Sequence, residues 1–491
     1  MGIHRCCRVR VCQSPVLTRA LAGGALYLLS QCRCRRWLRV KVMHERVAGI
    51  DVHKDMVKVA IRSPGEKRWA RKTEVLTFGT FYGVLREMAR ELRRRGVTHV
   101  AMEASGVYTE PVYYALMEED FDEVLVVNPA HVKAIKGQKT DAKDCARIAE
   151  LLECGLLQGS YLPPPELKEM RDLTRYRIKK VQARTSEIQR LGKTLESAGI
   201  KLGSVASDIT GTGPLEMIES LVNGERDGVV MAGLARGKAR TPQKMASLSM
   251  ALEGRFTRHH AAMCRLLIDQ VNALKAAVAG VEIQIAAKAA AWEREIALLK
   301  TIPGFGDATA WTWIAEIGPA PHQWFATHEK LACWAGLAPG NHVSAGKRRY
   351  GRVSDAGTYI KPALVQAAWS AVRVKGRLQA RYNKLVRRMG GPKNPAARKK
   401  AIVAIAHTML KIAYSVLKSG RPYQDPGADF YARRESPAQR QAYHQRQIQK
   451  LYPGCTVTVT ITPPPSGSTD AAPNAGQPGA PPPAGHVPEA V

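Results

Sequence analysis

The sequence lacks the cysteine patterns of a zinc site or of a disulfide-stapled fold. Five of its ten cysteines lie within the first 34 residues, and the other five, from Cys145 to Cys455, include no pair at zinc-ligand spacing. A secreted disulfide framework is therefore excluded. The pattern indicates a reducing, cytoplasmic setting.

Long apolar runs are missing as well. Residues 16–29 form a weakly apolar stretch, but Arg19 interrupts it and it is too short to cross a membrane, so we expect no membrane partner. Met43 stands just before the first clear strand, and residues 1–45 are interpreted as a disordered or mis-started extension. Residues 426–491 are basic at first and then rich in Pro, Ala and Gly, which predicts a disordered tail.

Acidic residues are too few to balance the basic ones. The chain has 74 Lys and Arg against 42 Asp and Glu, a net charge of +32. Such a field attracts polyanions, so nucleic acid is the expected partner. The basic residues are spread over the whole chain, which favours contacts through several domains; a generally basic protein is the alternative. The sequence contains no Walker motif and no nucleotide-binding glycine loop.

Short strands and helices alternate between residues 46 and 160. The apolar run at 47–52 and the strand-like segments after it, followed by helical spacing at 81–95, predict an α/β domain. The proline triplet at 163–165 marks the end of this domain.

Helical periodicity dominates the rest of the chain. Between residues 161 and 300, apolar residues recur first at helical spacing, from Ile178 to Leu195. From Leu267 to Leu299 they keep a nearly strict heptad spacing, which Lys288 breaks and from which Ile296 is one residue out of register. This spacing predicts a long helical hairpin or a coiled coil between subunits, with an inserted segment at 203–258. A mainly helical domain is expected at 301–425.

Four carboxylates occupy suggestive places in the predicted α/β domain. Asp51 ends the first strand, Glu103 ends a later strand, and Asp141 and Asp144 share one face of a helix. Crowded carboxylates repel unless a cation lies between them. Hard oxygen ligands select Mg²⁺ or Mn²⁺, and two such ions can clamp the attacking and leaving oxygens of a phosphodiester. Each acid alone is more typical of a helix cap or a solvated loop. The prediction therefore depends on their order along the chain: an Asp at a strand end, a Glu at a strand end, and then two Asp residues three positions apart on a helix.

The segment at 302–306 contains two glycines. Gly304 and Gly306 allow a tight turn whose backbone amides can point at a phosphate, as in helix-hairpin-helix DNA-binding elements. A simple turn between two helices is the alternative.

Ser344 lies in a predicted loop just before a basic run. A serine hydroxyl is a weak nucleophile, which needs a base or charge stabilisation in order to attack a phosphate. From the residues alone, a loop serine beside a phosphate-binding run is the favoured interpretation. The run consists of Lys347, Arg348, Arg349 and Arg352.

Together these motifs resemble the DEDD transposases of insertion-sequence family 110, which include the bridge-RNA-guided recombinases. The N-terminal similarity is carried by residues 49–54, 103–106, 128–129 and 139–144. The C-terminal similarity is carried by residues 302–306, 335–339, 344–347 and 417–420. The resemblance covers roughly residues 46–425, with the motifs in the expected order.

The resemblance implies an RNase H-like (RuvC-like) α/β domain with the DEDD motif, a long helical hairpin and a mainly helical C-terminal transposase domain. It also implies transposition of an insertion sequence by DNA recombination, with Mg²⁺ on Asp51, Glu103, Asp141 and Asp144. In that family, the serine at the position of Ser344 is the nucleophile that becomes linked to DNA.

The implied partners are DNA, a guide RNA and further copies of the chain, as a dimer or tetramer, in a nucleoid-associated cytoplasmic setting. The family often has Lys where this chain has Asp355, so Ser354 remains a rival nucleophile. Two other functions stay open. One is a structure-selective, RuvC-like DNA endonuclease that uses water as its nucleophile, and the other is a non-catalytic nucleic-acid-binding scaffold.

Overall fold

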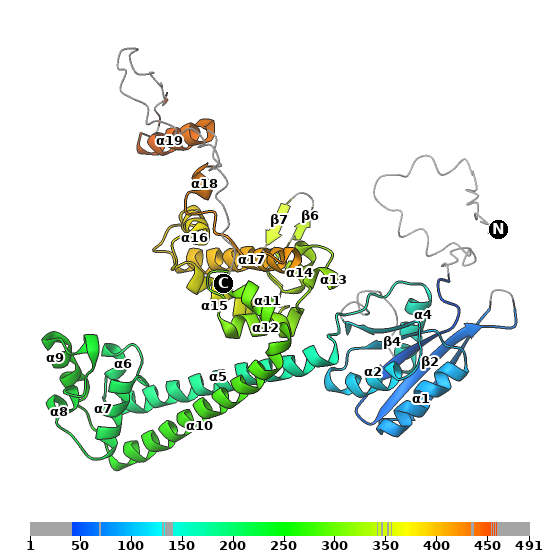
Figure 1. Cartoon of the computed structure of the whole chain (residues 1–491), viewed down its shortest axis with the longest axis horizontal. Helices are drawn as coiled ribbons and strands as arrows, with labels where there is room; N and C mark the ends of the chain where they lie inside the picture. Colours follow the sequence, from blue (N-terminus) through cyan, green and yellow to red (C-terminus); the bar gives the residue numbers. More distant parts are fainter. Residues whose placement is uncertain are drawn as a thin grey trace, which may run out of the picture. The chain divides into compact units, whose positions relative to one another are not determined.

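The computed structural model describes residues 42–458 except positions 68–69, 130–131, 133–140, 341, 345–346, 351–352, 355, 434–436, 453, 455 and 457. The chain divides into two compact units, Met1–Leu162 and Pro163–Val491. Figure 1 shows the elements of each unit, coloured along the sequence.

The N-terminal unit contains a five-stranded mixed sheet. Its strands are β1 (Val47–Val52), β2 (Met56–Pro64), β3 (Arg71–Gly79), β4 (His99–Glu103) and β5 (Glu123–Val127). Their order in the sheet is β3-β2-β1-β4-β5, with β1, β2 and β3 antiparallel and with β4 and β5 parallel to β1. This mixed sheet, flanked by helices, fits the predicted RNase H-like α/β domain.

Helices cover both faces of this sheet (Figure 1). On one face, α1 (Tyr82–Arg94) and α2 (Thr109–Met117) pack against strand residues such as Ile50 and Met102. On the other face, α4 (Asp141–Glu153) packs against residues that include Val47 and Ala101. Because strand side chains alternate between faces, each buried strand is apolar on both sides.

A buried ion-pair cluster holds the C-terminal end of α4 on the sheet. Glu153 is the last residue of α4, and its side chain is 3% exposed. It accepts hydrogen bonds from Arg62 Nε at 3.0 Å and Arg62 Nη2 at 2.8 Å, and it forms an ion pair with Arg71. A buried carboxylate is stable only when such donors replace its water. The cluster therefore links α4 to β2 and β3.

The second unit begins with a long helical hairpin. Helices α5 (Pro165–Ser197) and α10 (Arg258–Ala289) pair in antiparallel fashion, with Arg177 bonded to Glu282 at 2.7 Å near one end. The apolar seam of α10 is buried at Leu267, Val271, Leu274, Val278 and Ile285. This pairing within the chain corresponds to the hairpin that the heptad spacing predicts.

The two irregularities in the heptad spacing have structural explanations. Lys288, which breaks the pattern, forms an ion pair with Glu169 of α5. A short 3-10 turn, η4 (Ala290–Trp292), then ends α10, and Ile296 belongs to a separate helix, α11 (Glu293–Lys300). The irregularities in the predicted spacing therefore coincide with the place where α10 ends and α11 begins.

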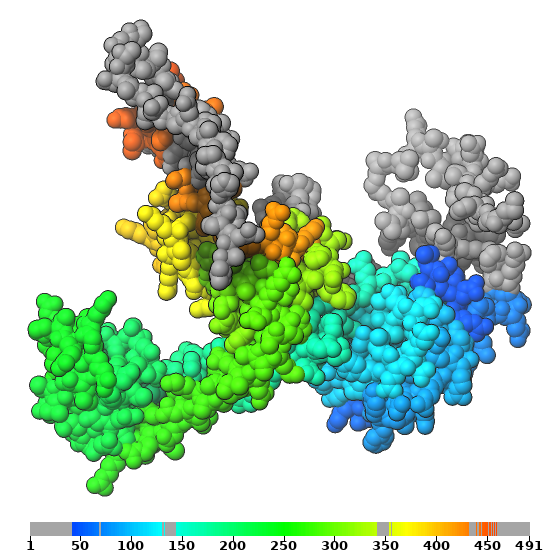
Figure 2. All heavy atoms as spheres, in the orientation of Figure 1, coloured from blue at the N-terminus to red at the C-terminus, as the bar shows by residue number. Residues whose placement is uncertain are grey.

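A helical subdomain caps the far end of the hairpin (Figures 1 and 2). It is built from α6 (Leu202–Val205), α7 (Thr212–Val222), α8 (Gly228–Ala232), η3 (Gly237–Ala239) and α9 (Pro242–Ala251). Its core joins Met217, Ile218 and Leu248 to Leu195 of α5 and Cys264 of α10. The expected inserted segment is thus a packed extension of the hairpin.

The C-terminal part of this unit is mainly helical. Its helices are α12 (Asp307–Ile317), α13 (Pro321–Trp324), α14 (His328–Trp334), α15 (Ile360–Ala371), α16 (Arg377–Arg388) and α17 (Pro395–Ser419). Among the described helices, only α17 is long and apolar enough to cross a membrane, and 67% of its most apolar window is buried inside the protein. Helices α18 (Phe430–Arg433) and α19 (Pro437–Leu451) occupy the basic segment, while the tail after residue 458 lies outside the described residues.

Buried charges join α5 to α12. Arg171, 8% exposed, donates from Nε to the Ala315 carbonyl and from Nη2 to the Glu316 carbonyl, both at 2.9 Å. These carbonyls lie in the last turn of α12, where the helix itself supplies no partner. Arg175 binds the Glu316 carboxylate with two bonds, of 2.7 and 2.9 Å. Arg171 and Arg175 therefore connect the hairpin to the C-terminal helices.

We expect Val278→Asp to lower the free energy of unfolding by several kcal/mol, because Val278 is 6% exposed in the hairpin seam and an unpaired carboxylate there would lose its water. Ile283→Asp is the matched control, since Ile283 lies on the same helix and is 72% exposed. Denaturant unfolding of both variants checks the prediction. Equal stability of the two variants would contradict it.

Candidate active site

The sheet register brings Asp51 and Glu103 to one edge. Strands β1 and β4 are parallel neighbours, with Ile50 opposite Met102, so Asp51 and Glu103 occupy the next positions along the two strands. Ile50 and Met102 face α1 and α2, and strand side chains alternate. Asp51 and Glu103 therefore lie on the face of the sheet that α4 covers.

Asp51 is nearly enclosed and has a defined partner. Its side chain is 14% exposed, and its Oδ2 lies 2.9 Å from Nε2 of His53. Burial raises the pKa of the Cys145 thiol in α4, and the negative charge of Asp51 raises it further. Cys145 is buried together with Val47 and Ala101, on the face of the sheet that α4 covers.

Gly49 allows α4 to approach the sheet closely. A Cβ at this position would lie 2.2 Å from the Cys145 carbonyl oxygen and 2.3 Å from the Ala149 amide nitrogen. Both are backbone atoms of α4, which cannot move aside as a flexible side chain would. Asp144 directly precedes Cys145, so the same contact brings Asp144 to the edge of β1 and β4.

Asp141 and Asp144 both lie on α4, as the sequence predicts. Asp144 is partly exposed, whereas the side chain of Asp141 lies outside the described residues. Among the side chains that the structure describes, no group of three or more His, Cys, Asp or Glu is arranged to hold a metal ion. Asp51, Glu103 and Asp144 offer carboxylate oxygens, a chemistry that suits Mg²⁺ or Mn²⁺.

Ser344 closes a short strand instead of lying in the predicted loop. Strands β6 (His342–Ser344) and β7 (Lys347–Tyr350) form an antiparallel hairpin in which Ser344 pairs with Lys347. The sequence does not predict this strand, because β6 and β7 are only three and four residues long and are too short to show the alternation of apolar and polar residues that is typical of a strand. The basic residues Lys347, Arg348 and Arg349 lie on β7; their side chains and that of Ser344, like the whole of Arg352, lie outside the described residues.

Two glycines close the base of the β6–β7 hairpin. Gly336 and Gly357 have φ values of +64° and +70°. A Cβ on Gly336 would lie 2.3 Å from the Ala356 oxygen, and one on Gly357 would lie 2.2 Å from the Ala335 oxygen. The two chain segments therefore touch backbone to backbone, and only glycine fits at either position.

The rival Ser354 lies at this base, away from the paired end of the hairpin. Its side chain is exposed, and its carbonyl accepts a hydrogen bond of 2.7 Å from Lys361 Nζ. Asp355, where the sequence departs from the resembled family, lies outside the described residues.

The glycines at 304 and 306 form the turn between α11 and α12. Gly304 has a φ of +88°, and a Cβ there would lie 2.2 Å from the Ala367 oxygen of α15. The close packing of this turn against α15 is therefore enough to explain why a glycine occupies position 304. Gly306 caps α12, and a Cβ there would meet nothing within 4 Å. A role in phosphate binding stays a prediction for both.

Sequence reasoning missed the structural roles of Gly49 and Glu153. Gly49 lies two residues before Asp51 in the same motif, and a glycine within an apolar strand is the available signal. Glu153 is an ordinary acidic residue at the end of a helix. Only the distant residues Arg62 and Arg71 reveal its role.

Two segments of the chain match transposase families. Residues 48–200 match a family of IS110-type DEDD transposases, and residues 296–383 match the IS116/IS110/IS902 family of transposases. A probable family 20 transposase of Pseudomonas aeruginosa is 27% identical over 277 residues, which are 56% of this chain and 71% of that protein. A pilin gene-inverting protein of Moraxella bovis is 33% identical over 128 residues, 26% of this chain and 38% of that protein.

The solved structure of RuvC from Thermus thermophilus is also similar in part. The two sequences are 17% identical, and the aligned region covers 23% of this chain and 99% of the RuvC chain, with a TM-score of 0.19.

We expect Gly49→Ala to destabilise the N-terminal unit by roughly 1–3 kcal/mol, the usual range for overpacking a well-packed core. The added Cβ must displace α4, because the atoms it meets are backbone. Gly83→Ala in α1 is the matched control, since a Cβ at Gly83 meets nothing within 4 Å. Thermal unfolding of the two variants tests the contact. A Gly49→Ala protein as stable as the control would show that α4 does not approach β1 this closely.

Proposed function

Because the chain belongs to the IS110 family of transposases, which are DNA transposase/recombinase enzymes, we propose that it cuts and rejoins DNA through a serine–DNA intermediate. The observation that carries the proposal is the placement of Asp51 and Glu103 on neighbouring parallel strands, beneath the helix that bears Asp144. Two of the proposed carboxylates thus share one face of the sheet, and a third lies on the helix that covers that face.

We assign Asp51, Glu103, Asp141 and Asp144 as the ligands of Mg²⁺ or Mn²⁺. When bound, these ions would offset the negative charge of the phosphodiester that is cut. The protein would supply the ligand oxygens from two elements of structure, the sheet and a helix: Asp51 and Glu103 lie on β1 and β4, and Asp141 and Asp144 lie on α4, which contacts Gly49 closely. The hydrogen bond from His53 limits the rotation of the Asp51 carboxylate.

Ser344 is the proposed nucleophile. Its hydroxyl oxygen attacks phosphorus, a new serine–phosphate ester forms, and the bond from phosphorus to the leaving strand breaks. The proton from the serine ends on the oxygen of that strand. One ester replaces another, so the step can be reversed without ATP. This agrees with a sequence that has no nucleotide-binding motif.

The β6–β7 hairpin supports Ser344 over Ser354. Ser344 is paired with Lys347 near the end of the hairpin, next to the basic strand β7. Cations there would hold the phosphate and stabilise the charge that develops on it. Ser354 instead lies at the base that Gly336 and Gly357 close.

We further propose that a guide RNA directs the reaction and that the protein acts as a homo-oligomer, a dimer or tetramer, on DNA in the nucleoid. A net charge of +32 spread along the chain supports contacts with more than one nucleic-acid segment. The second candidate function is a structure-selective endonuclease that uses water. The N-terminal unit supports it, because this compact unit carries all four carboxylates.

Asp51→Ala should reduce strand cleavage in Mg²⁺ by about 10²-fold or more, the scale of losing one electrostatic contact at a reacting centre. Asp120→Ala is the control, because Asp120 is an exposed carboxylate of the same unit. Cleavage of a labelled DNA duplex, with and without a chelator, measures the effect. If the Asp51→Ala variant cleaves DNA as fast as the wild type does, the assignment of Asp51 to the metal site is wrong.

Ser344→Ala should eliminate covalent protein–DNA adducts and rejoining, while DNA binding remains, because the basic strand is unchanged. Ser354→Ala should leave adduct formation close to wild type. The reaction is stopped with denaturant, and the DNA-linked peptide is mapped by mass spectrometry. A link at Ser354 would overturn the assignment, and cleavage without any adduct would favour the water-dependent endonuclease.

A further inference from the structure

A pocket lies in the helical subdomain at the end of the hairpin. Its volume is about 320 Å³, at the lower end of the range for small-molecule sites. The subdomain, formed by α6 to α9, lies between the two segments that match transposase families, 48–200 and 296–383. Nothing in the proposed reaction at Asp51 and Ser344 uses this pocket.

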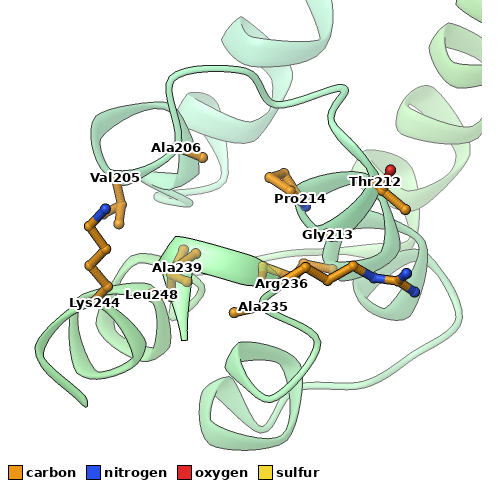
Figure 3. A pocket seen from close by; sticks show the side chains of 11 residues that line it. Val205, Ala206, Thr212, Gly213, Pro214, Ala235, Arg236, Ala239, Lys244 and Leu248 are labelled. Carbon is orange, nitrogen blue, oxygen red and sulfur yellow. The ribbon is translucent and has the colours of Figure 1, made fainter. Parts of the chain in front are cut away.

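The pocket has an apolar floor and a basic rim. Most of its lining is aliphatic: Val205, Ala206, Pro214, Met217, Ala235, Ala239 and Leu248. Figure 3 shows Lys244 beside Val205 at one side of the opening and Arg236 at the other. The floor suits a flat, weakly polar group, and the rim suits an anion attached to it.

A second hollow of about 450 Å³ adjoins the pocket. The two share Ala235 and Arg236, and the second is lined also by Glu216, Gly233, Leu234, Gly237 and Arg240. Arg236 binds the Glu216 carboxylate through Nε at 3.1 Å and Nη2 at 2.5 Å, so this ion pair holds the arginine between the two hollows.

Three of the cations around the hollows have no acidic partner among the described residues. No acidic residue occurs between positions 228 and 252, whereas Arg236, Lys238, Arg240 and Lys244 all fall within nine residues. The last three are exposed, and within the described part of the chain no ion pair involves them. Their charge is therefore available to a polyanion.

We propose that the pocket receives the base of an unpaired nucleotide of the DNA substrate, while Arg240 and Lys244 bind its flanking phosphates. This inference rests on the proposed function, because cutting and exchanging strands exposes unpaired DNA. A base that is stacked in a duplex cannot enter a pocket. An unpaired base can, and it then exchanges its contact with water for contact with the apolar lining of the pocket. Phosphates on both sides of that base would lie over the second hollow and the Lys244 rim.

The test measures binding of the full chain to a fluorescein-labelled single-stranded DNA by fluorescence anisotropy over a range of salt concentrations. The same strand with abasic sites, its duplex and an RNA of the same sequence complete the probes. The variants are Arg240→Glu with Lys244→Glu, which reverses the charges, and Ala206→Phe, which fills the pocket. Lys193→Glu with Lys275→Glu is the charge-matched control, because both lysines are exposed on the hairpin outside the pocket.

The charge-reversal variant should weaken binding to the single strand and reduce the slope of log K against log salt by roughly 0.7 for each of two lost phosphate contacts. Ala206→Phe should weaken binding to the single strand without changing that slope and should leave binding to the abasic strand as it is. The control variant should bind nearly as the wild type does. Thermal unfolding checks that each variant is folded.

Three outcomes would overturn the proposal: an equal loss in the control variant, wild-type binding by Ala206→Phe, or tighter binding of the duplex or of the RNA. Asp51→Ala separates this proposal from the catalytic one, since it should lose cleavage yet bind the single strand normally. If the wild-type chain neither cleaves nor forms adducts, the proposed function fails, and the pocket is still judged by the anisotropy alone.

Discussion

The N-terminal unit depends on the backbone contact between Gly49 and α4. Because no Cβ intervenes, α4 lies directly on β1, and its first turns reach the edge where β1 and β4 end. At the other end of the helix, Glu153 is held by Arg62 and Arg71. A helix fixed at two points has a defined direction relative to β1.

The second unit relies on a different device, a buried carboxylate shared by two arginines. Arg171 and Arg175 both approach Glu316, and Arg171 also satisfies two carbonyls in the last turn of α12. Such a network is costly to break, because losing one member leaves an unpaired buried charge. It connects the long hairpin, and through it the subdomain with the apolar pocket, to the helices that carry the β6–β7 hairpin.

Glycines in the C-terminal motifs have packing roles that stand apart from any ligand. Gly304, Gly336 and Gly357 all have positive φ values and face backbone oxygens at distances that exclude a side chain. The interpretation of Gly304 as a phosphate-binding residue is therefore not needed to explain its presence. The contacts of Gly336 with Ala356 and of Gly357 with Ala335 instead explain how a short and strongly basic β-hairpin can be held at its base.

Local pattern determined much of this protein in advance. The apolar runs predicted β1, β2, β4 and β5 but not β3, and the heptad spacing predicted the helical hairpin, since these features depend on residues close together in the chain. The sequence also placed Asp51 and Glu103 near the ends of two strands, but only the parallel pairing of β1 with β4 brings them to one edge of the sheet. Tertiary structure alone decided the rest: the approach of α4 to Gly49, the strand that contains Ser344, the break at η4 and the pocket beside Lys244. These features arise from contacts between residues far apart in the sequence, where atomic distances and not periodicity set the outcome.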